Sequence, residues 1–169
     1  MYSGDLSQFT ATKFKQCVYQ QYQESFHTDI ANMSSLKMFK LLKESTHKSP
    51  YLYNSHSNFK AIQLKFRLRT GVLGLGEDLY RQNRGDGLCQ HCLQFESAYH
   101  FILQCPAYSR QRVQMYNDIK EHVNEDLFSA FLADPFCALS SLLGDCDDAF
   151  NMYFLKYLRE CWLIRSEMI

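Results

Sequence analysis

The stretch from Gly87 to Pro106 places three cysteines and one histidine at the spacing C-x2-C-x7-H-x4-C. A structural zinc ion takes four sulfur or nitrogen ligands in a tetrahedron, and a C-x2-C turn directs two thiolates toward one point. Cys89 and Cys92 form such a pair, and Gly85 and Gly87 just before them permit a tight turn. This spacing constrains the fold more than any other feature of the chain, because four side chains have to meet.

The second half of the pattern supplies His100 and Cys105. The letters "ESAYHFILQC" predict a short helix, and Pro106 ends it at Cys105. A histidine on this helix and a cysteine on the helix's last turn can face the same ion as the two cysteines of the C-x2-C turn. We therefore predict that Cys89, Cys92, His100 and Cys105 bind Zn²⁺.

An alternative is that the three cysteines are buried free thiols, since free cysteine is a common core residue. Against it, the flanks "QHCLQFES" are polar and offer this stretch little core of its own, so that a metal ion would have to order it. His91 lies inside the turn, and we expect it to be exposed and not a ligand. Seven cysteines are an odd number, which favours ligands and thiols over a disulfide framework.

The rest of the chain has a helical apolar period nearly throughout, and thirteen Phe with eleven Tyr predict a core rich in aromatic rings. The fold class expected is mainly α: a helical domain with a small zinc-ordered CCHC insert. The expected division is a basic helical region at 1–84, the insert at 85–112, and a helical region at 113–169 that forms one compact unit with 1–84. Helices are predicted over residues 6–26, 34–46, 59–71, 107–123, 125–135, 135–144 and 147–168, although the alternation "LKFRLR" in the third also fits a strand.

Several side chains are expected in the core. The first helix would present an apolar stripe of Phe9, Phe14, Val18 and Tyr22, with Ser7 as a possible cap, and residues 107–123 would present Val113, Tyr116, Ile119 and Val123. Trp162 and the four other cysteines, Cys17, Cys137, Cys146 and Cys161, are most simply core residues. The glycines of "GVLGLGED" are explained by turns rather than by a nucleotide-binding loop, because no βαβ unit surrounds them.

The zero net charge hides an asymmetry. Residues 36–84 hold ten Lys or Arg against three Asp or Glu, a charge of +7, and residues 118–150 hold one against eight, a charge of −7. One interpretation is a basic face that meets an anionic partner; the other is that both faces are simply solvated.

Residues 64–112 resemble the C-terminal zinc-binding region of reverse transcriptases from non-LTR retrotransposons. The shared pattern is a basic helix end at Arg69 to Gly71, a variable loop, the C-x2-C pair, a block from His100 to Pro106, and a following Y-x-x-x-R from Tyr108 to Arg112. The resemblance implies a non-catalytic tail module that assists a polymerase in holding RNA or DNA. It also implies that this chain is a piece of a retroelement polyprotein, or derives from one.

The polymerase motifs of that family are missing from the sequence. Asp147 and Asp148 are adjacent carboxylates, but they open a helical pattern, where Asp is expected as a cap. We therefore expect no enzymatic activity from this chain.

The expected function is binding of RNA or single-stranded DNA through a basic surface beside the zinc site, with Phe66, Tyr80 and Tyr108 stacking on bases. The alternative is a structural or protein-interaction domain in which zinc serves folding only and the aromatic helices dock on the polymerase part of a parent protein or on another copy of the chain. No membrane contact is expected, and the location would be intracellular, in the nucleus or the cytoplasm. The predicted nucleic-acid ligands are Lys60, Lys65, Arg67, Arg69, Arg81, Arg84, Arg110 and Arg112.

Overall fold

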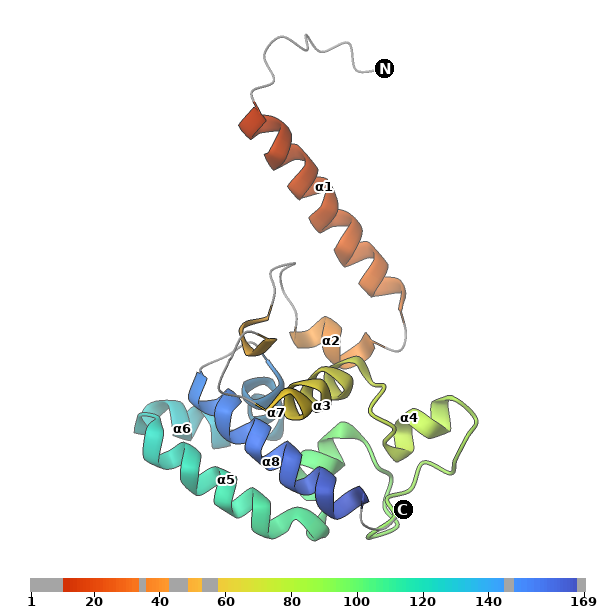
Figure 1. Ribbon diagram of the computed structural model, residues 1–169, viewed down its shortest axis with the longest axis vertical. Coiled ribbons are helices and arrows are strands. Elements are labelled where there is room, and N and C mark those ends of the chain that lie inside the picture. The colour runs from red at the N-terminus through yellow and green to blue at the C-terminus, as the bar shows by residue number, and fades with distance from the viewer. Residues whose placement is uncertain (1–10, 34–35, 43–48, 53–57, 145–147, 167–169) are drawn as a thin grey trace.

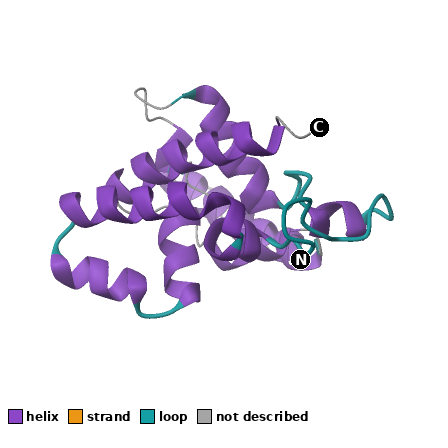
Figure 2. Cartoon of the chain, turned by 90° about the horizontal axis from the view of Figure 1, so that it is seen from below, coloured by secondary structure: helices purple, strands orange, loops and turns teal. Residues whose placement is uncertain are grey.

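The computed structural model describes residues 11–33, 36–42, 49–52, 58–144 and 148–166, and the prediction of a mainly helical fold is confirmed (Figure 1). Within these ranges the only strand-like pairing is a single bridge between Leu88 and Phe95. Figure 2 shows most of the longer loops gathered at one side of a body otherwise made of helices. The helices are α1 (Ala11–Asn32), α2 (Lys37–Leu42), α3 (Phe59–Thr70), α4 (Gly76–Arg81), α5 (Ser109–His122), α6 (Glu125–Leu132), α7 (Pro135–Leu143) and α8 (Asp148–Ser166), with short 3₁₀ turns at Pro50–Leu52 and Pro106–Tyr108 and a π-helical turn at His100–Gln104.

The helix ends follow local sequence signals. Asn58 caps α3 by accepting a hydrogen bond from the Lys60 amide, and Gly71 ends it in the left-handed region at φ 66°. This excludes the strand alternative for "LKFRLR". Asp134 caps α7 ahead of Pro135 by accepting hydrogen bonds from the two amides that follow the proline.

Helix α8 is the centre of the body and packs against α3, α5 and α7 (Figure 1). Its buried side chains recur at helical spacing, and aromatic rings make up much of the core around it, as the composition predicts. The core includes Leu64 and Leu68 of α3, Met115 and Ile119 of α5, Phe131 of α6, Leu142 and Leu143 of α7, and Phe150, Phe154, Tyr157, Leu158 and Cys161 of α8.

The cysteine-rich segment is part of this same core rather than a separate unit. Cys89, Phe101, Ile102 and Cys105 are all fully buried in it. The Tyr157 hydroxyl of α8 donates hydrogen bonds to the carbonyl oxygens of Ile102 at 2.9 Å and Phe101 at 3.2 Å. The main helix of the body therefore positions the segment that carries His100.

Some expected core residues lie elsewhere. In α1, Phe14, Val18, Tyr22 and Cys17 are exposed, because this helix extends away from the body (Figure 1). In α5, Val113 is exposed, whereas Ile119 is buried and Tyr116 and Val123 pack against the core, as predicted; Met115 is a buried residue that the predicted stripe did not include.

The predictions that Trp162 and the cysteines outside the ligand set lie in the core are confirmed only in part. Cys161 is buried, as predicted, whereas Cys137 is partly exposed. Trp162 is partly buried, and its ring lies 6.0 Å from the Arg165 guanidinium. Ser7, Phe9 and Cys146 lie outside the described residues.

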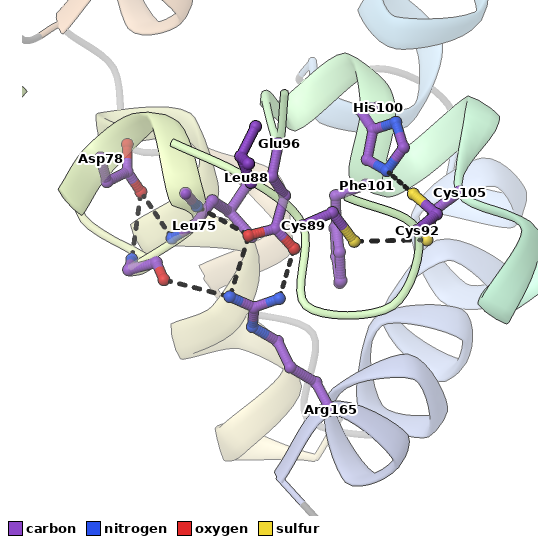
Figure 3. A network of polar contacts seen from close by, with 12 residues as sticks. Leu75, Asp78, Leu88, Cys89, Cys92, Glu96, His100, Phe101, Cys105 and Arg165 are labelled. Atoms are coloured by element: carbon purple, nitrogen blue, oxygen red, sulfur yellow. Dashed lines mark hydrogen bonds and ion pairs between the residues drawn. The ribbon is translucent and has the colours of Figure 1, made fainter. Parts of the chain in front are cut away.

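A buried ion pair joins the cysteine-rich segment to the end of α8 (Figure 3). Glu96 and Arg165 are both buried and form a two-pronged pair, with Arg165 Nη1 on Glu96 Oε1 and Nη2 2.9 Å from Oε2. Glu96 Oε2 also accepts a hydrogen bond from the Gly76 amide at 2.7 Å, and Arg165 Nη2 donates to the Gly74 carbonyl. Three separate parts of the chain therefore meet at one carboxylate.

Within the described residues, no single helix has both the length and the apolar character needed to cross a bilayer. Among the described helices, only α6 and α7 taken together meet both criteria, and these two helices are bent by 116° relative to each other.

We predict that Glu96→Gln lowers the free energy of unfolding by about 3 kcal/mol, because it leaves the Arg165 charge buried without its counter-ion. Urea denaturation followed by circular dichroism measures the change. The matched control is Asp118→Asn, which removes the charge from the more exposed Lys156–Asp118 pair and should cost less than about 1 kcal/mol. Equal losses in the two variants would contradict the assignment of Glu96 as a buried anchor.

Candidate metal centre

A tight turn over residues 88–95 brings the first two cysteines together. The Cys89 amide donates to the Gln94 carbonyl at 2.7 Å, and the Leu93 amide donates back to the Cys89 carbonyl at 2.9 Å. Leu93 closes the turn in the left-handed region at φ 59°. The backbone therefore holds Cys89 and Cys92 on one side of the turn, as the C-x2-C spacing predicts.

The glycines before this turn are needed for close packing. Gly87 has φ 85°, and its carbonyl accepts a hydrogen bond from the Glu96 amide at 2.8 Å. A Cβ added to Gly76 would lie 2.5 Å from that same Gly87 oxygen, so only glycine fits there. The glycines of "GVLGLGED" therefore serve turns, as predicted, and Gly76 in addition allows the close approach of α4 to the metal-binding turn.

The second ligand pair lies on a π-helical turn, which differs from the ordinary short helix that the sequence predicts. Residues five apart in an α-helix are separated by about 140° around the axis. Here the Cys105 amide donates to the His100 carbonyl at 2.8 Å, an i→i+5 bond that widens the turn. The wider turn brings His100 and Cys105 to the same side, and Pro106 follows at the point where the turn ends, as predicted.

The four predicted ligand side chains converge on one point (Figure 3). Their ligand atoms all lie within 4.8 Å of one another; Cys89 Sγ is 3.8 Å from Cys105 Sγ, and Cys92 Sγ is 3.3 Å from His100 Nε2. With metal–sulfur and metal–nitrogen bonds of about 2.3 and 2.0 Å, a tetrahedral ion needs sulfur–sulfur edges of about 3.8 Å and sulfur–nitrogen edges of about 3.5 Å. The cluster therefore has the size of a tetrahedral metal site.

The surroundings of the cluster favour its neutral forms and make a bound cation the natural counterpart. Burial raises the pKa of the Cys89 thiol and raises the pKa of Cys105 to about 12. Burial also lowers the pKa of His100, which leaves the imidazole neutral and able to bind a metal through Nε2. A divalent ion supplies the positive charge that stabilises the thiolates in such a place.

Arg112 supports the cluster from α5. Its Nε donates to the Ile102 carbonyl at 3.0 Å, and its Nη2 donates to the Cys105 carbonyl at 2.5 Å. These carbonyls lie on and just after the π-helical turn. The guanidinium predicted to bind nucleic acid is therefore engaged in holding the backbone between two ligands.

The other predicted cations separate into buried, paired and exposed side chains. Lys65 and Arg69 are buried, which corrects their assignment to a nucleic-acid surface, because a buried cation cannot meet a phosphate in solution. Lys65 Nζ donates to the Gly144 carbonyl and to Asn151 Oδ1, and both cations lie near the Tyr51 ring. Arg81 is paired with Asp78 at 2.6 Å. The cations left on the surface are Lys60, Arg67, Arg84 and Arg110.

The aromatic residues named for base stacking also divide. Phe66 and Tyr80 are exposed, whereas Tyr108 is fully buried against Phe101, which corrects its assignment. His91, expected to be exposed, is partly buried with its ring edge-on to Tyr108. Phe95, which no sequence motif singles out, is 51% exposed and pairs edge-to-face with Tyr80 at 6.4 Å.

The paired carboxylates are only partly described. Asp148 is exposed and opens α8, the place where an acidic residue is expected, and Asp147 lies outside the described residues.

We predict about one metal ion per chain when the protein is purified with zinc, and its loss in Cys92→Ala and His100→Ala, since each removes a ligand. Elemental analysis measures the content, and Cys17→Ala, which removes an exposed cysteine of α1, is the control that should keep the metal. A strong chelator should lower the Tm by about 10 °C or more, because binding energy at a structural site is folding energy. An unchanged Tm together with a metal-free native protein would refute the site.

We also predict that zinc binding at pH 7 releases at least two protons per chain. Cys89 and Cys105 have pKa values raised by burial and are therefore thiols at this pH, whereas His100 has a lowered pKa and carries no extra proton. Zinc affinity should consequently rise with pH through the neutral range. A pH-indicator dye in weak buffer counts the protons, and binding without proton release would show that these thiols are not ligands.

Comparison of the chain with family models, with curated proteins and with solved structures gave no match. The convergence of three sulfurs and one imidazole is therefore the observation on which the function is argued.

Proposed function

We propose that the protein is a non-catalytic zinc-binding module from the reverse transcriptase of a non-LTR retroelement, which helps to hold RNA or single-stranded DNA beside the zinc. The observation that carries the proposal is that the ligand set of the resembling motif, Cys89, Cys92, His100 and Cys105, meets within 4.8 Å. A set of ligands together with its flanking residues is more specific than cysteine spacing alone.

The flanking residues of the motif support the proposal because each has a defined structural place, and Phe101 and Arg112 have theirs on the segment that holds the ligands. Gly71 ends α3 in the left-handed region, Phe101 is buried between the ligands of the π-helical turn, and Arg112 holds the carbonyl of Cys105. Tyr108 is packed edge-on against both His91 and Phe101. The part of the motif from Cys89 to Arg112 thus contains the ligands and the side chains that pack beside them or hold their backbone.

Zinc is the metal that suits this donor set. Three thiolates and one imidazole are soft and borderline ligands, which favour zinc over magnesium or calcium, and the four of them fill a tetrahedral coordination sphere. A site with four protein ligands has no open position for substrate or water. We therefore assign the zinc to folding, and we expect no catalytic activity from this module.

A candidate nucleic-acid surface lies around the metal-binding turn. Tyr80 and Phe95 are 57% and 51% exposed, and their edge-to-face contact offers ring faces on which unpaired bases can stack. Arg84 is exposed in the loop between them, and Arg110 is exposed on the first turn of α5. Lys60 and Arg67 are exposed on α3 and are two further cations available to phosphates.

The alternative function is a structural or protein-interaction domain in which zinc serves folding only. It is favoured by one observation: Lys65, Arg69, Arg81 and Arg112, half of the cations assigned to the nucleic acid, are used inside the fold or in pairs. On this alternative the partner is the polymerase part of the parent protein. Either proposal places the module inside the cell, in the nucleus or the cytoplasm.

We predict that the zinc-loaded protein binds a single-stranded RNA of about 20 nucleotides with an affinity that falls steeply between about 50 and 200 mM salt. Arg84→Ala combined with Arg110→Ala should weaken binding and reduce the slope of log K against log salt by about 1.4, since about 0.7 is lost for each phosphate contact. Tyr80→Ala with Phe95→Ala should weaken binding while leaving the slope unchanged. Fluorescence anisotropy of labelled RNA measures each affinity.

The control for this experiment is Lys13→Ala with Lys120→Ala, which removes two exposed cations that lie on α1 and at the far end of α5 from the metal-binding segment. It should leave affinity and slope nearly unchanged. Weak binding with no salt slope would favour the structural alternative. Equal losses in the control and in the arginine variants would mean that the contact is diffuse and does not involve the surface beside the zinc.

A further inference from the structure

Helix α1 has the length of an ordinary structural helix, but within the part of the chain that the structure describes no face of it is packed along its length against the body. It spans 22 residues, and of residues 12–29 none is buried. It meets the body at its C-terminal end, where Ile30 is buried and the Lys40 ammonium donates to the Ala31 carbonyl at 2.7 Å (Figure 1). Isolated helices are marginal in water, and most helices in proteins are stabilised by packing of one face. A second helix packed against the exposed face of α1 would supply this stabilisation.

One face of α1 is apolar and open to solvent. Phe14, Val18 and Tyr22 follow one another at four-residue steps and are 62%, 49% and 59% exposed. Together with Lys15 and Tyr19 they line a shallow hollow of about 280 Å³. Three large apolar side chains at this spacing form a continuous stripe, and a stripe of this kind is the usual contact face of a helix that packs against another helix.

The charges on α1 identify what covers the stripe. Lys13 and Lys15 lie at its N-terminal end, and Glu24 and Asp29 lie toward its C-terminal end. The first turn has no acidic residue and the last turn no basic one, so these charges do not favour the helix's own dipole. An antiparallel helix with the same charge order places acidic residues beside the lysines and lysines beside the acidic residues. A second copy of α1 has this order.

We propose that α1 pairs antiparallel with α1 of a second copy of this chain and that the protein is a two-fold symmetric dimer. With the pairing centred near Gln20, Val18 faces Tyr22 of the second copy and Phe14 faces Phe26 of the second copy. Lys15, at the edge of the stripe, then lies within reach of Asp29 of the second copy. Each contact occurs twice, as an isologous interface requires.

The antiparallel direction follows from the same residues. In a parallel pair Lys15 would face Lys15 and Asp29 would face Asp29, and like charges across a helix contact are unfavourable. In the antiparallel pair the two helix dipoles also point in opposite directions, which is favourable. The two bodies, each with its own metal centre, then lie at opposite ends of the paired helices. The stripe is therefore covered without any contact between the metal centres.

The experiment uses the full-length, zinc-loaded chain in analytical ultracentrifugation over a range of concentrations. The expected result is a reversible dimer that dissociates on dilution. Val18→Asp should give a monomer over the whole range, because a carboxylate is placed in the centre of the stripe. Leu132→Asp is the matched control: Leu132 is also about half exposed, but on α6, and the substitution should leave the dimer intact.

Charge reversal tests the orientation. Lys15→Glu alone should weaken the dimer by roughly tenfold, because two attractive pairs become repulsive, and Asp29→Lys alone should do the same. The double variant, Lys15→Glu with Asp29→Lys, should restore the affinity. Circular dichroism of each variant verifies that the helical content of the body is retained.

Three results would overturn the proposal. A monomer at every concentration would show that α1 does not pair with a second copy and that any partner of the stripe is a different protein. Equal weakening by Val18→Asp and Leu132→Asp would place the contact outside α1. Charge reversals that weaken the dimer without restoration in the double variant, or that leave it unchanged, would exclude the antiparallel pairing.

Discussion

The buried carboxylate of Glu96 is the point at which the parts of this molecule are joined. It is paired with Arg165 at the end of α8, it accepts the amide of Gly76 at the start of α4, and its own amide is bonded to Gly87 ahead of the metal-binding turn. A buried charge is costly unless each of its hydrogen-bonding positions is filled, so these contacts form together or not at all. The position of Cys89 relative to α8 depends on this arrangement.

The metal centre and the Glu96–Arg165 ion pair hold different parts of one short segment, residues 87–105. Within residues 87–105 the fully buried apolar side chains are those of Phe101 and Ile102, besides the ligands Cys89 and Cys105. Burial of so little apolar surface does not by itself offset the entropy cost of ordering the segment. The ion pair and the Tyr157 hydroxyl fix its backbone to α8, while the ligands draw the turn and the π-helical turn together. Arg112, on the following helix α5, adds a further contact to the metal centre, because it donates a hydrogen bond to the backbone carbonyl of the ligand Cys105.

Much of this architecture could be predicted from the sequence, because the signals were local. Helical period, Gly71 and Pro135 marked helix limits that the structure has, and the C-x2-C-x7-H-x4-C spacing named the four side chains that meet. The π-helical turn was not predictable in the same way. Only the five-residue step from His100 to Cys105, combined with the demand that both face one ion, hints at it.

What sequence could not supply was the direction in which long or amphipathic side chains point. Lys65 and Arg69 looked like surface cations, but α3 turns them inward, toward a backbone carbonyl, an amide oxygen and aromatic rings that come from distant parts of the chain. Phe14 and Val18 looked like core residues, yet periodicity states only that a helix has an apolar face and not which molecule covers it. Tertiary contacts decide both questions.

The position of Trp162 gives the molecule a built-in optical reporter. It is the only tryptophan of the chain, and its ring lies 6.0 Å from the Arg165 guanidinium that holds Glu96. A positive charge at this distance perturbs the excited indole, so intrinsic emission senses whether the guanidinium is in place. We therefore expect the label-free fluorescence of Trp162 to change when the cysteine-rich segment leaves Arg165 and the guanidinium loses Glu96 as its partner.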